Sequence, residues 1–260
     1  MADKLQGTTV LVTGGAGGLG KAIATGYLNE GANVVVCDIN EERLEQVRGE
    51  LELTGRFLAV STDITDESAV NKLVDTAVAK FGRLDIVVSN AGMTDKFDPV
   101  GTLSKEHWDR IINLNLTGSF LIFKAAVNAF EKQSPSGGTI IQIGSTASYY
   151  GTAAGAAYTA SKHGVAALVK NTAGFYEAKG IYAIGLNIGA MIDTNIKDGF
   201  QSLGGFNRET FALSISSTFK PEQAIQLKDV AKYCVFLADR DIAATTTGSM
   251  INLNKNTPKA

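Results

Sequence analysis

The chain has 260 residues, of which 24 are Lys or Arg, 26 are Asp or Glu, and 45% are hydrophobic. This length allows one large domain or two small ones, and a single domain of this size buries roughly three-quarters of its unfolded surface. The near-neutral charge gives no electrostatic reason to expect nucleic acid or an anionic membrane as a partner.

The cysteines and histidines are few and far apart. Cys37 and Cys234 both lie in apolar patterns, so they are expected to be core thiols and not a disulfide. With two cysteines and two histidines, no metal site is expected. The N-terminal residues lack the apolar core of a signal peptide, and no apolar run is expected to span a bilayer. A cytoplasmic protein is therefore expected.

Strand and helix patterns alternate through the first half of the chain. The predicted strands cover residues 9–12, 33–37, 57–60 and 84–88. The predicted helices between them cover residues 19–30, 41–53 and 66–81. Each strand is a near-continuous apolar run, which is typical of a parallel strand buried on both faces.

The second half continues the alternation. Ser104 is the expected N-cap of one long helix through Phe130. The later strands are predicted at residues 139–143, 181–186 and 249–253, and the later helices at 156–178 and 228–237. Repeated βα units of this kind predict a parallel sheet with helices on both faces, and no linker divides the chain.

A glycine-rich turn, Thr-Gly-Gly-Ala-Gly-Gly-Leu-Gly, occupies residues 13–20, between the first strand and the first helix. Glycines allow a tight turn and a close approach of the backbone to a pyrophosphate, and the helix N-terminus beyond supplies N–H donors. A plain turn is the alternative, but the position at the first crossover favours a cofactor site.

Asp38 ends the second strand, near the expected spacing of about 20 residues beyond such a turn. Its carboxylate can accept both ribose hydroxyls of NAD and would repel the 2′-phosphate of NADP. No Lys or Arg stands at residues 15–17 or at Ile39 to bind that phosphate. NAD(H) is therefore the expected cofactor, although a solvated Asp at a strand end is the alternative.

Tyr158 and Lys162 lie four residues apart in a predicted helix, so their side chains share one face. A free phenol titrates near pH ~10, and a neighbouring ammonium lowers that pKa by favouring the phenolate. The pair is a credible proton-transfer device, and an ordinary amphipathic helix is the alternative.

These motifs, in this order, resemble the classical branch of the short-chain dehydrogenase/reductase family. The further matching motifs are Asp63-Ile64-Thr65, Ser89-Asn90-Ala91-Gly92, Asn115-Leu116-Thr117-Gly118, and Ser145 thirteen residues before Tyr158. The resemblance implies one Rossmann-type doubly wound parallel sheet of about seven strands across residues 1–260. Its cofactor half would cover about 1–138, and its catalytic and substrate half about 139–260.

The resemblance also implies the residue roles. Tyr158 would exchange a proton with the substrate, Ser145 would donate a hydrogen bond to the substrate oxygen, Lys162 would hold the nicotinamide ribose, and Asn115 would position a water. The implied cofactor-binding residues are Gly14, Gly17, Gly18, Leu19, Asp38, Ile39, Asp63, Ile64, Asn90, Ala91, Gly92, Tyr158, Lys162, Gly189, Ile192 and Thr194.

The C-terminal part departs from the family pattern. The usual Pro-Gly pair after the sixth strand is Ile188-Gly189, the usual Arg-Val-Asn is Tyr182-Ala183-Ile184, and the last turn is Leu253-Asn254-Lys255-Asn256. These departures favour a specialised member with altered geometry at the nicotinamide end.

Regular patterning breaks down between Asp193 and Lys228, where glycines and four phenylalanines are scattered: Phe200, Phe206, Phe211 and Phe219. This region covers the substrate in the family, so it is expected to be a mobile lid that orders on binding. Its apolar side chains favour a hydrophobic or cyclic substrate, and simple packing is the alternative.

The favoured function is an NAD-dependent oxidoreductase that interconverts a secondary alcohol and a ketone. The alternatives are a non-redox enzyme of the same fold, such as a dehydratase, isomerase or cyclase, and a non-catalytic nucleotide-binding protein. A homo-oligomer is expected, with a tetramer favoured, through the helices at 104–130 and 156–178, where Ala160, Ala166 and Ala167 would allow close packing.

Overall fold

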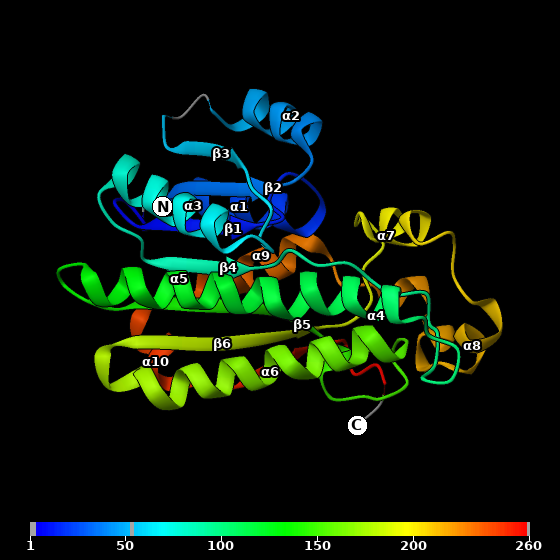
Figure 1. Cartoon of the computed structure of the whole chain (residues 1–260). Helices are drawn as coiled ribbons and strands as arrows, with labels where there is room; N and C mark the ends of the chain where they lie inside the picture. Colours follow the sequence, from blue (N-terminus) through cyan, green and yellow to red (C-terminus); the bar gives the residue numbers. More distant parts are fainter. Residues whose placement is uncertain (1–3, 53–54, 259–260) are drawn as a thin grey trace.

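Seven parallel strands form one sheet in the order β3-β2-β1-β4-β5-β6-β7. The computed structural model describes residues 4–52 and 55–258 (Figure 1). The strands are β1 (Thr9–Thr13), β2 (Asn33–Asp38), β3 (Phe57–Ser61), β4 (Ile86–Ser89), β5 (Gly138–Ser145), β6 (Ile181–Ile188) and β7 (Met250–Leu253). The predicted parallel sheet of about seven strands is confirmed. Its order reverses between β1 and β4, where ligands of such sheets bind at the carboxyl ends of the strands.

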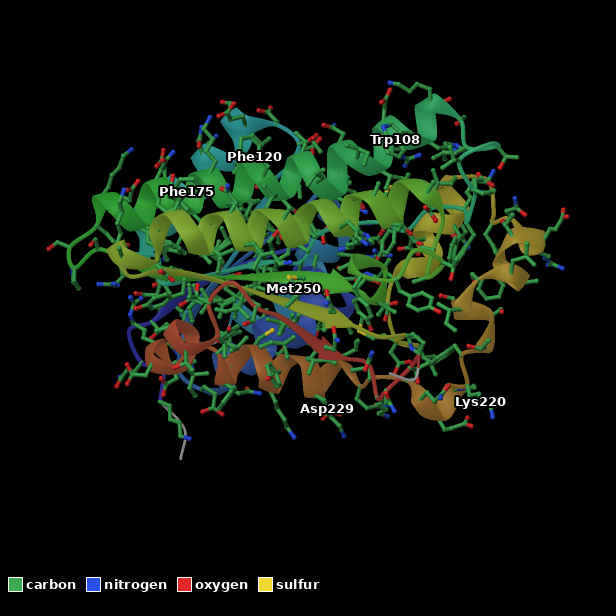
Figure 2. The ribbon with its side chains drawn as sticks, turned by 90° about the horizontal axis from the view of Figure 1, so that it is seen from below. Trp108, Phe120, Phe175, Lys220, Asp229 and Met250 are labelled. Carbon is green, nitrogen blue, oxygen red and sulfur yellow. The ribbon has the colours of Figure 1, made fainter. Side chains whose placement is uncertain are left out.

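Helices cover both faces of the sheet. They are α1 (Gly18–Asn29), α2 (Glu41–Leu51), α3 (Glu67–Phe81), α4 (Lys105–Ile112), α5 (Ser119–Lys132), α6 (Ala156–Tyr176), α7 (Ile196–Ser202), α8 (Arg208–Leu213), α9 (Leu227–Phe236) and α10 (Arg240–Thr246). Figure 2 shows the sheet, marked by Met250, between a layer that carries Phe120 and Phe175 and a layer that carries Asp229.

Strand residues alternate between two hydrophobic cores. Val10 and Val12 face α1 and α9, whereas Leu11 faces α3 and α5. All three side chains are fully buried. Burial on both faces explains why the strands read as continuous apolar runs in the sequence.

Side-chain caps set several element boundaries. The Asp66 carboxylate accepts hydrogen bonds from Ser68 N and Ala69 N at the start of α3, and Gly82 ends that helix with φ 85°. The α2 helix ends at Leu51, and the predicted end of that helix at Leu53 lies outside the described residues. The predicted strand at 84–88 begins instead at Ile86, and the backbone N and O of Leu84 bond to the Gln133 side chain.

The predicted long helix is interrupted by a π-helical turn. Ser104 caps α4 by accepting a hydrogen bond from His107 N at 3.2 Å, as expected. The chain then forms a π-helical turn at Asn113–Gly118 before α5. Such turns are rare and occur often at functional sites, and this one carries Asn115.

The expectation that no apolar run could span a bilayer is wrong by the criteria of length and composition. The continuous helical segment Lys105–Lys132 has 28 residues and an 18-residue window of mean hydropathy 1.2. In the fold, 56% of that window is buried, and core helices of soluble proteins meet the same two criteria.

The segment after β6 is more regular than its sequence pattern. It folds into α7, α8 and two 3₁₀ turns, Ile215–Thr218 and Pro221–Gln223. Figure 1 shows α7 and α8 at the end of the sheet next to α4. These helices have six or seven residues, too few for a clear hydrophobic period. The equally short α10 was not predicted for the same reason.

Both cysteines are free and buried, as the sequence predicts. Burial raises the pKa of each thiol to about 12, so both are protonated at neutral pH.

Candidate active site

The glycine-rich turn joins β1 to α1 at the carboxyl edge of the sheet. A Cβ at Gly15 would lie 2.6 Å from Val36 Cβ, and a Cβ at Gly20 would collide with the carbonyl oxygen of Gly14. Gly17 is the N-cap of α1 and provides no side-chain cap. The N–H groups in the first turn of α1, around Gly18 and Leu19, therefore receive no hydrogen bond from a capping side chain. Uncapped N–H groups at a helix N-terminus are suited to bind a phosphate.

The segment after β4 braces this turn. Asn90 Nδ2 donates to Thr13 O at 2.8 Å and to Gly14 O at 3.2 Å. The backbone N–H groups of Asn90 and Ala91 both donate to Thr13 Oγ1 at 3.0 Å. The Asn90 side chain thus supports the cofactor turn from behind.

Asp38 ends β2 beside the same turn, as predicted. Its carboxylate accepts hydrogen bonds from Asn40 N at 3.1 Å and, more weakly, from Ala16 N at 3.4 Å. The neighbouring Ile39 is 70% exposed, so this corner is open to solvent. The arrangement leaves carboxylate lone pairs for the hydroxyl groups of a ribose.

Asp63 and Ile64 follow β3, and their side chains are already engaged. The Asp63 carboxylate accepts hydrogen bonds from the N and Oγ1 of Thr65, each at 2.8 Å. Ile64 is 4% exposed and packs against Gly118, where a Cβ would lie 2.8 Å from Ile64 Cδ1. The Ile64 side chain belongs to the core, so only its backbone is available to a ligand.

The four predicted catalytic residues converge at the ends of β5 and α6. Lys162 Nζ donates to Ile143 O at 3.0 Å and lies 5.5 Å from the centroid of the Tyr158 ring. Ser145, the last residue of β5, forms a hydrogen bond with the Tyr158 side chain. A Cβ at Gly92 would lie 3.1 Å from Asn115 Oδ1 and 3.8 Å from Lys162 Nζ. The side chains of Asn115 and Lys162 therefore both lie next to Gly92.

The Asn115 side chain is 1% exposed and fully bonded. It accepts from Met93 N and donates to Met93 O, both at 2.9 Å, and it donates to Ser161 Oγ at 3.2 Å. Ser161 Oγ in turn donates to Tyr158 O at 2.7 Å. Asn115 therefore ties the segment after β4 to the helix that carries Tyr158.

Burial dominates the proton affinities of the central pair. It raises the pKa of Tyr158 to about 12, with a smaller raising effect from Asp95 and a lowering effect from the Ser145 hydrogen bond. Burial also lowers the pKa of Lys162 to about 8. The net shift of the Tyr158 pKa is therefore upward, because desolvation is the largest effect. The Lys162 ammonium donates its hydrogen bond to Ile143 O, and its expected lowering of the Tyr158 pKa stays a prediction.

The predicted nicotinamide end lies beside the altered C-terminal turn. Gly189 N donates to Leu253 O at 2.9 Å, and a Cβ at Gly189 would lie 2.9 Å from Asn254 Cα. Ile192 is 52% exposed. The buried Oγ1 of Thr194 finds no hydrogen-bond partner among residues 4–52 and 55–258. Such an orphaned hydroxyl fits a ligand that supplies the missing polar partner.

The structure adds residues that the sequence did not indicate. Arg43 on α2 forms an ion pair with Asp198 on α7 at 2.5 Å. The side chain of Asn195 lies against the position where a Cβ of Gly17 would stand. The segment after β6 therefore crosses the glycine turn. Arg43 and Asp198 are 155 positions apart, so no local sequence pattern could indicate their contact.

The candidate active site does not coincide with the large groove on the surface of the protein. A groove of about 930 Å³ lies between α3 and α5, and it contains none of the predicted site residues. Among the described residues, no three His, Cys, Asp or Glu side chains gather as metal ligands.

Comparison with known proteins gives consistent matches along the chain. The family model for short chain dehydrogenases matches residues 8–202. The short chain dehydrogenase/reductase dpchG of Colletotrichum higginsianum is 43% identical over 250 residues, which cover 95% of this chain and 92% of the relative. The 3beta-hydroxysteroid dehydrogenase 2 of Eggerthella lenta is 38% identical over 178 residues, 68% of each chain.

A solved structure gives the same result. The 3-ketoacyl-(acyl-carrier-protein) reductase from Brucella melitensis, complexed with NADH, superposes with a TM-score of 0.84 and 27% identity. The match covers 98% of this chain and 99% of that chain.

Proposed function

Because the chain belongs to the short-chain dehydrogenase/reductase family of oxidoreductases, which act on small molecules with a nicotinamide cofactor, we propose that it interconverts a secondary alcohol and a ketone with NAD(H). The observation that carries the proposal is the convergence of Ser145, Tyr158, Lys162 and Asn115 at one end of the sheet. Because all four of these residues are present, catalysis is favoured over a non-catalytic nucleotide-binding role.

The residues that would hold the cofactor are suited to it. The start of α1 lacks a side-chain cap at Gly17, and Asp38 ends the adjacent strand. The orphaned hydroxyl of Thr194 offers a polar contact at the opposite end. The Asp38 carboxylate supports a preference for NAD(H), because the 2′-phosphate of NADP would meet a like charge there.

The catalytic roles follow from proton affinity and hydrogen bonding. The bound cofactor supplies or accepts the hydride. Tyr158 exchanges the proton of the substrate hydroxyl, and the Ser145 hydroxyl stabilises the negative charge that develops on the substrate oxygen. With a pKa of about 12, Tyr158 holds its proton at neutral pH and is prepared to protonate a ketone oxygen during reduction. Alcohol oxidation needs the phenolate, so its rate should rise with pH.

A hydrophobic, ring-shaped substrate is the proposed class. Phe97, Phe200, Phe206 and Phe211 form a cluster with ring centroids 5.0 to 6.5 Å apart beside the segment that follows β4. The cluster supplies apolar surface at the end of the sheet where the catalytic residues lie. The relative from Eggerthella lenta is named for a hydroxysteroid, a fused-ring secondary alcohol.

Self-association through α5 and α6 is also proposed, with a homotetramer as the favoured state. Phe120 is 45% exposed on α5 and Phe175 is 74% exposed on α6, and Figure 2 shows both on the same helix layer. Exposed aromatic side chains on paired helices are typical of an interface. We further propose that residues 1–260 act as one domain in the cytoplasm, without a nucleic-acid or membrane partner.

Light scattering tests the proposed assembly. Tetramers are expected at micromolar concentration, and Phe175→Glu should shift the population toward smaller species. A wild-type protein that elutes only as a 27.4 kDa monomer would contradict the proposal.

Steady-state assays that follow NADH absorbance test the reaction. A panel of cyclic secondary alcohols and ketones, including hydroxysteroids and ketosteroids, is expected to show turnover. Tyr158→Phe should lower kcat by at least about a hundredfold, the usual scale of acid–base catalysis, while NADH affinity stays nearly unchanged. Tyr176→Phe, at the other end of α6, is the matched control and should be neutral. Retained activity in Tyr158→Phe, or NADH binding without any redox turnover, would contradict the proposal.

A further inference from the structure

A buried carboxylate outside the predicted catalytic set lies next to Tyr158. Asp95 belongs to the segment between β4 and α4 and is 1% exposed. No ion pair involves it within the described part of the chain. A buried carboxylate without a cation is costly, so its hydrogen-bond partners identify its role.

Those partners are backbone N–H groups, two of them at the start of α6. Asp95 Oδ1 accepts from Gly155 N at 3.0 Å, and Oδ2 accepts from Tyr158 N at 2.9 Å. The carbonyl of Asp98 accepts from Ala156 N at 3.0 Å. The α6 N-cap, Gly155, has no side chain of its own to do this. Asp95 therefore replaces the missing local cap from 60 residues away in sequence.

The Asp95 carboxylate also bonds to Phe97, the residue against which α8 packs. Asp95 Oδ1 accepts from Phe97 N at 3.0 Å, and Phe97 has φ 64°, a strained conformation for a residue with a side chain. The carbonyl of Phe97 accepts from Thr210 Oγ1 at 2.6 Å, and its ring centroid lies 5.0 Å from that of Phe211. One side chain thus connects the catalytic helix to the aromatic cluster.

We propose that Asp95 is a positioning residue for the reaction, which fixes Tyr158 through the first turn of α6 and couples its position to the docking of α8 at Phe97. This inference rests on the proposed oxidoreductase function. A proton-transfer group must stay within hydrogen-bond reach of the substrate oxygen, so small displacements of the first turn of α6 reduce kcat.

The charge of Asp95 adds a second, separable effect. The groups that face Tyr158 are Lys162 from its own helix, Ser145 from β5 and Asp95 from the segment after β4. Burial is the main cause that raises the pKa of the Asp95 carboxyl, and Asp98 adds a smaller raising effect. The negative charge of Asp95 disfavours the phenolate and so raises the pKa of Tyr158. Removing that charge should lower the pKa of Tyr158 and move the acid limb of alcohol oxidation to lower pH.

Asp95→Asn tests both effects. The new amide nitrogen cannot accept a hydrogen bond, so one of the helix N–H groups loses its partner. We expect kcat to fall by about tenfold to a hundredfold, the scale of a misplaced catalytic group, with NADH affinity unchanged and the pH profile displaced to lower pH. The matched control is Asp98→Asn, which removes a charge three positions away and whose side chain bonds Asn207 Nδ2. An undisplaced pH profile, or an equal loss in Asp98→Asn, would overturn the proposal.

Gly155→Ala gives a second variant that keeps the charge. A Cβ at Gly155 would lie 2.6 Å from Asp95 Oδ2, and its φ of −73° is allowed for alanine. Displacement of the carboxylate should lower kcat without altering the fold. Full activity in this variant would count against a positioning role.

Hydrogen exchange separates this inference from the proposed function, because it needs no turnover. In Asp95→Asn, the amide of Gly155 or of Tyr158, whichever faces the new side-chain nitrogen, should exchange faster than in the wild type, and Asp98→Asn should leave both unchanged. Wild-type exchange at both amides in Asp95→Asn refutes the cap, whatever reaction the protein catalyses. Faster exchange in a protein without any redox activity leaves the cap in place and refutes the oxidoreductase function.

Discussion

Replacing Lys162 with methionine should stabilise the fold while it abolishes turnover. Lys162 is 5% exposed, and the hydrogen bond of its Nζ goes to Ile143 O. Burial lowers its pKa from 10.5 to about 8. At about 1.4 kcal/mol for each pH unit, keeping this ammonium charged inside the fold costs about 3 kcal/mol at pH 7. Methionine has a similar shape and no charge, so this cost disappears.

The stability difference between Lys162→Met and the wild type should depend on pH. The unfolded chain holds the Lys162 proton up to about pH 10.5, whereas the folded chain releases it near pH 8. Between these values the unfolded state binds more protons, so the contribution of Lys162 to stability rises with pH. The advantage of Lys162→Met should therefore be greatest below pH 8 and should shrink by about 3 kcal/mol by pH 10.5.

Urea denaturation measures this difference through the fluorescence of Trp108, the only tryptophan of the chain. Wild type and Lys162→Met are compared without cofactor, at equal concentration, at pH 7, 8.5 and 10.5. Lys170→Met, at an exposed position of the same helix, is the control and should change stability by less than about 0.5 kcal/mol throughout. A Lys162→Met variant that is less stable than wild type at pH 7, or a difference independent of pH, would refute the reasoning.

Four further predictions concern the proposed cofactor site. Asp38→Ala should narrow the preference of kcat/KM for NAD over NADP, and a preference of the wild type for NADPH would contradict the role of that carboxylate. Gly20→Ala should lower stability by about 1 to 3 kcal/mol in urea denaturation, because its Cβ collides with the carbonyl of Gly14; an unchanged midpoint would show that the turn can open. Asp198→Asn removes the partly exposed ion pair with Arg43 and should speed NADH release in stopped-flow fluorescence by no more than about fivefold. Unchanged release would show that the ion pair does not retain the cofactor. If residues 193–228 form a lid, their amides should exchange more slowly with NADH bound, and equal exchange with and without NADH would show a fixed wall.

Local patterns determined the fold and most candidate residues. The apolar strand runs, the glycine turn at 13–20 and the spacing of Tyr158 and Lys162 are each contained within a few residues. Since both faces of a parallel sheet are buried, its strands have a direct sequence signature. Motif order along the chain then indicated Asn115 and Ser145 as members of the same site.

Tertiary structure decided the properties that depend on contacts between distant segments. The direction of the Tyr158 pKa shift follows from burial, which the Tyr-x-x-x-Lys spacing does not encode. The cap that Asp95 provides for α6 joins residues 60 and 63 positions apart. Desolvation and backbone hydrogen bonding are set by which elements meet in space, and only the folded chain brings Tyr158 next to Asp95.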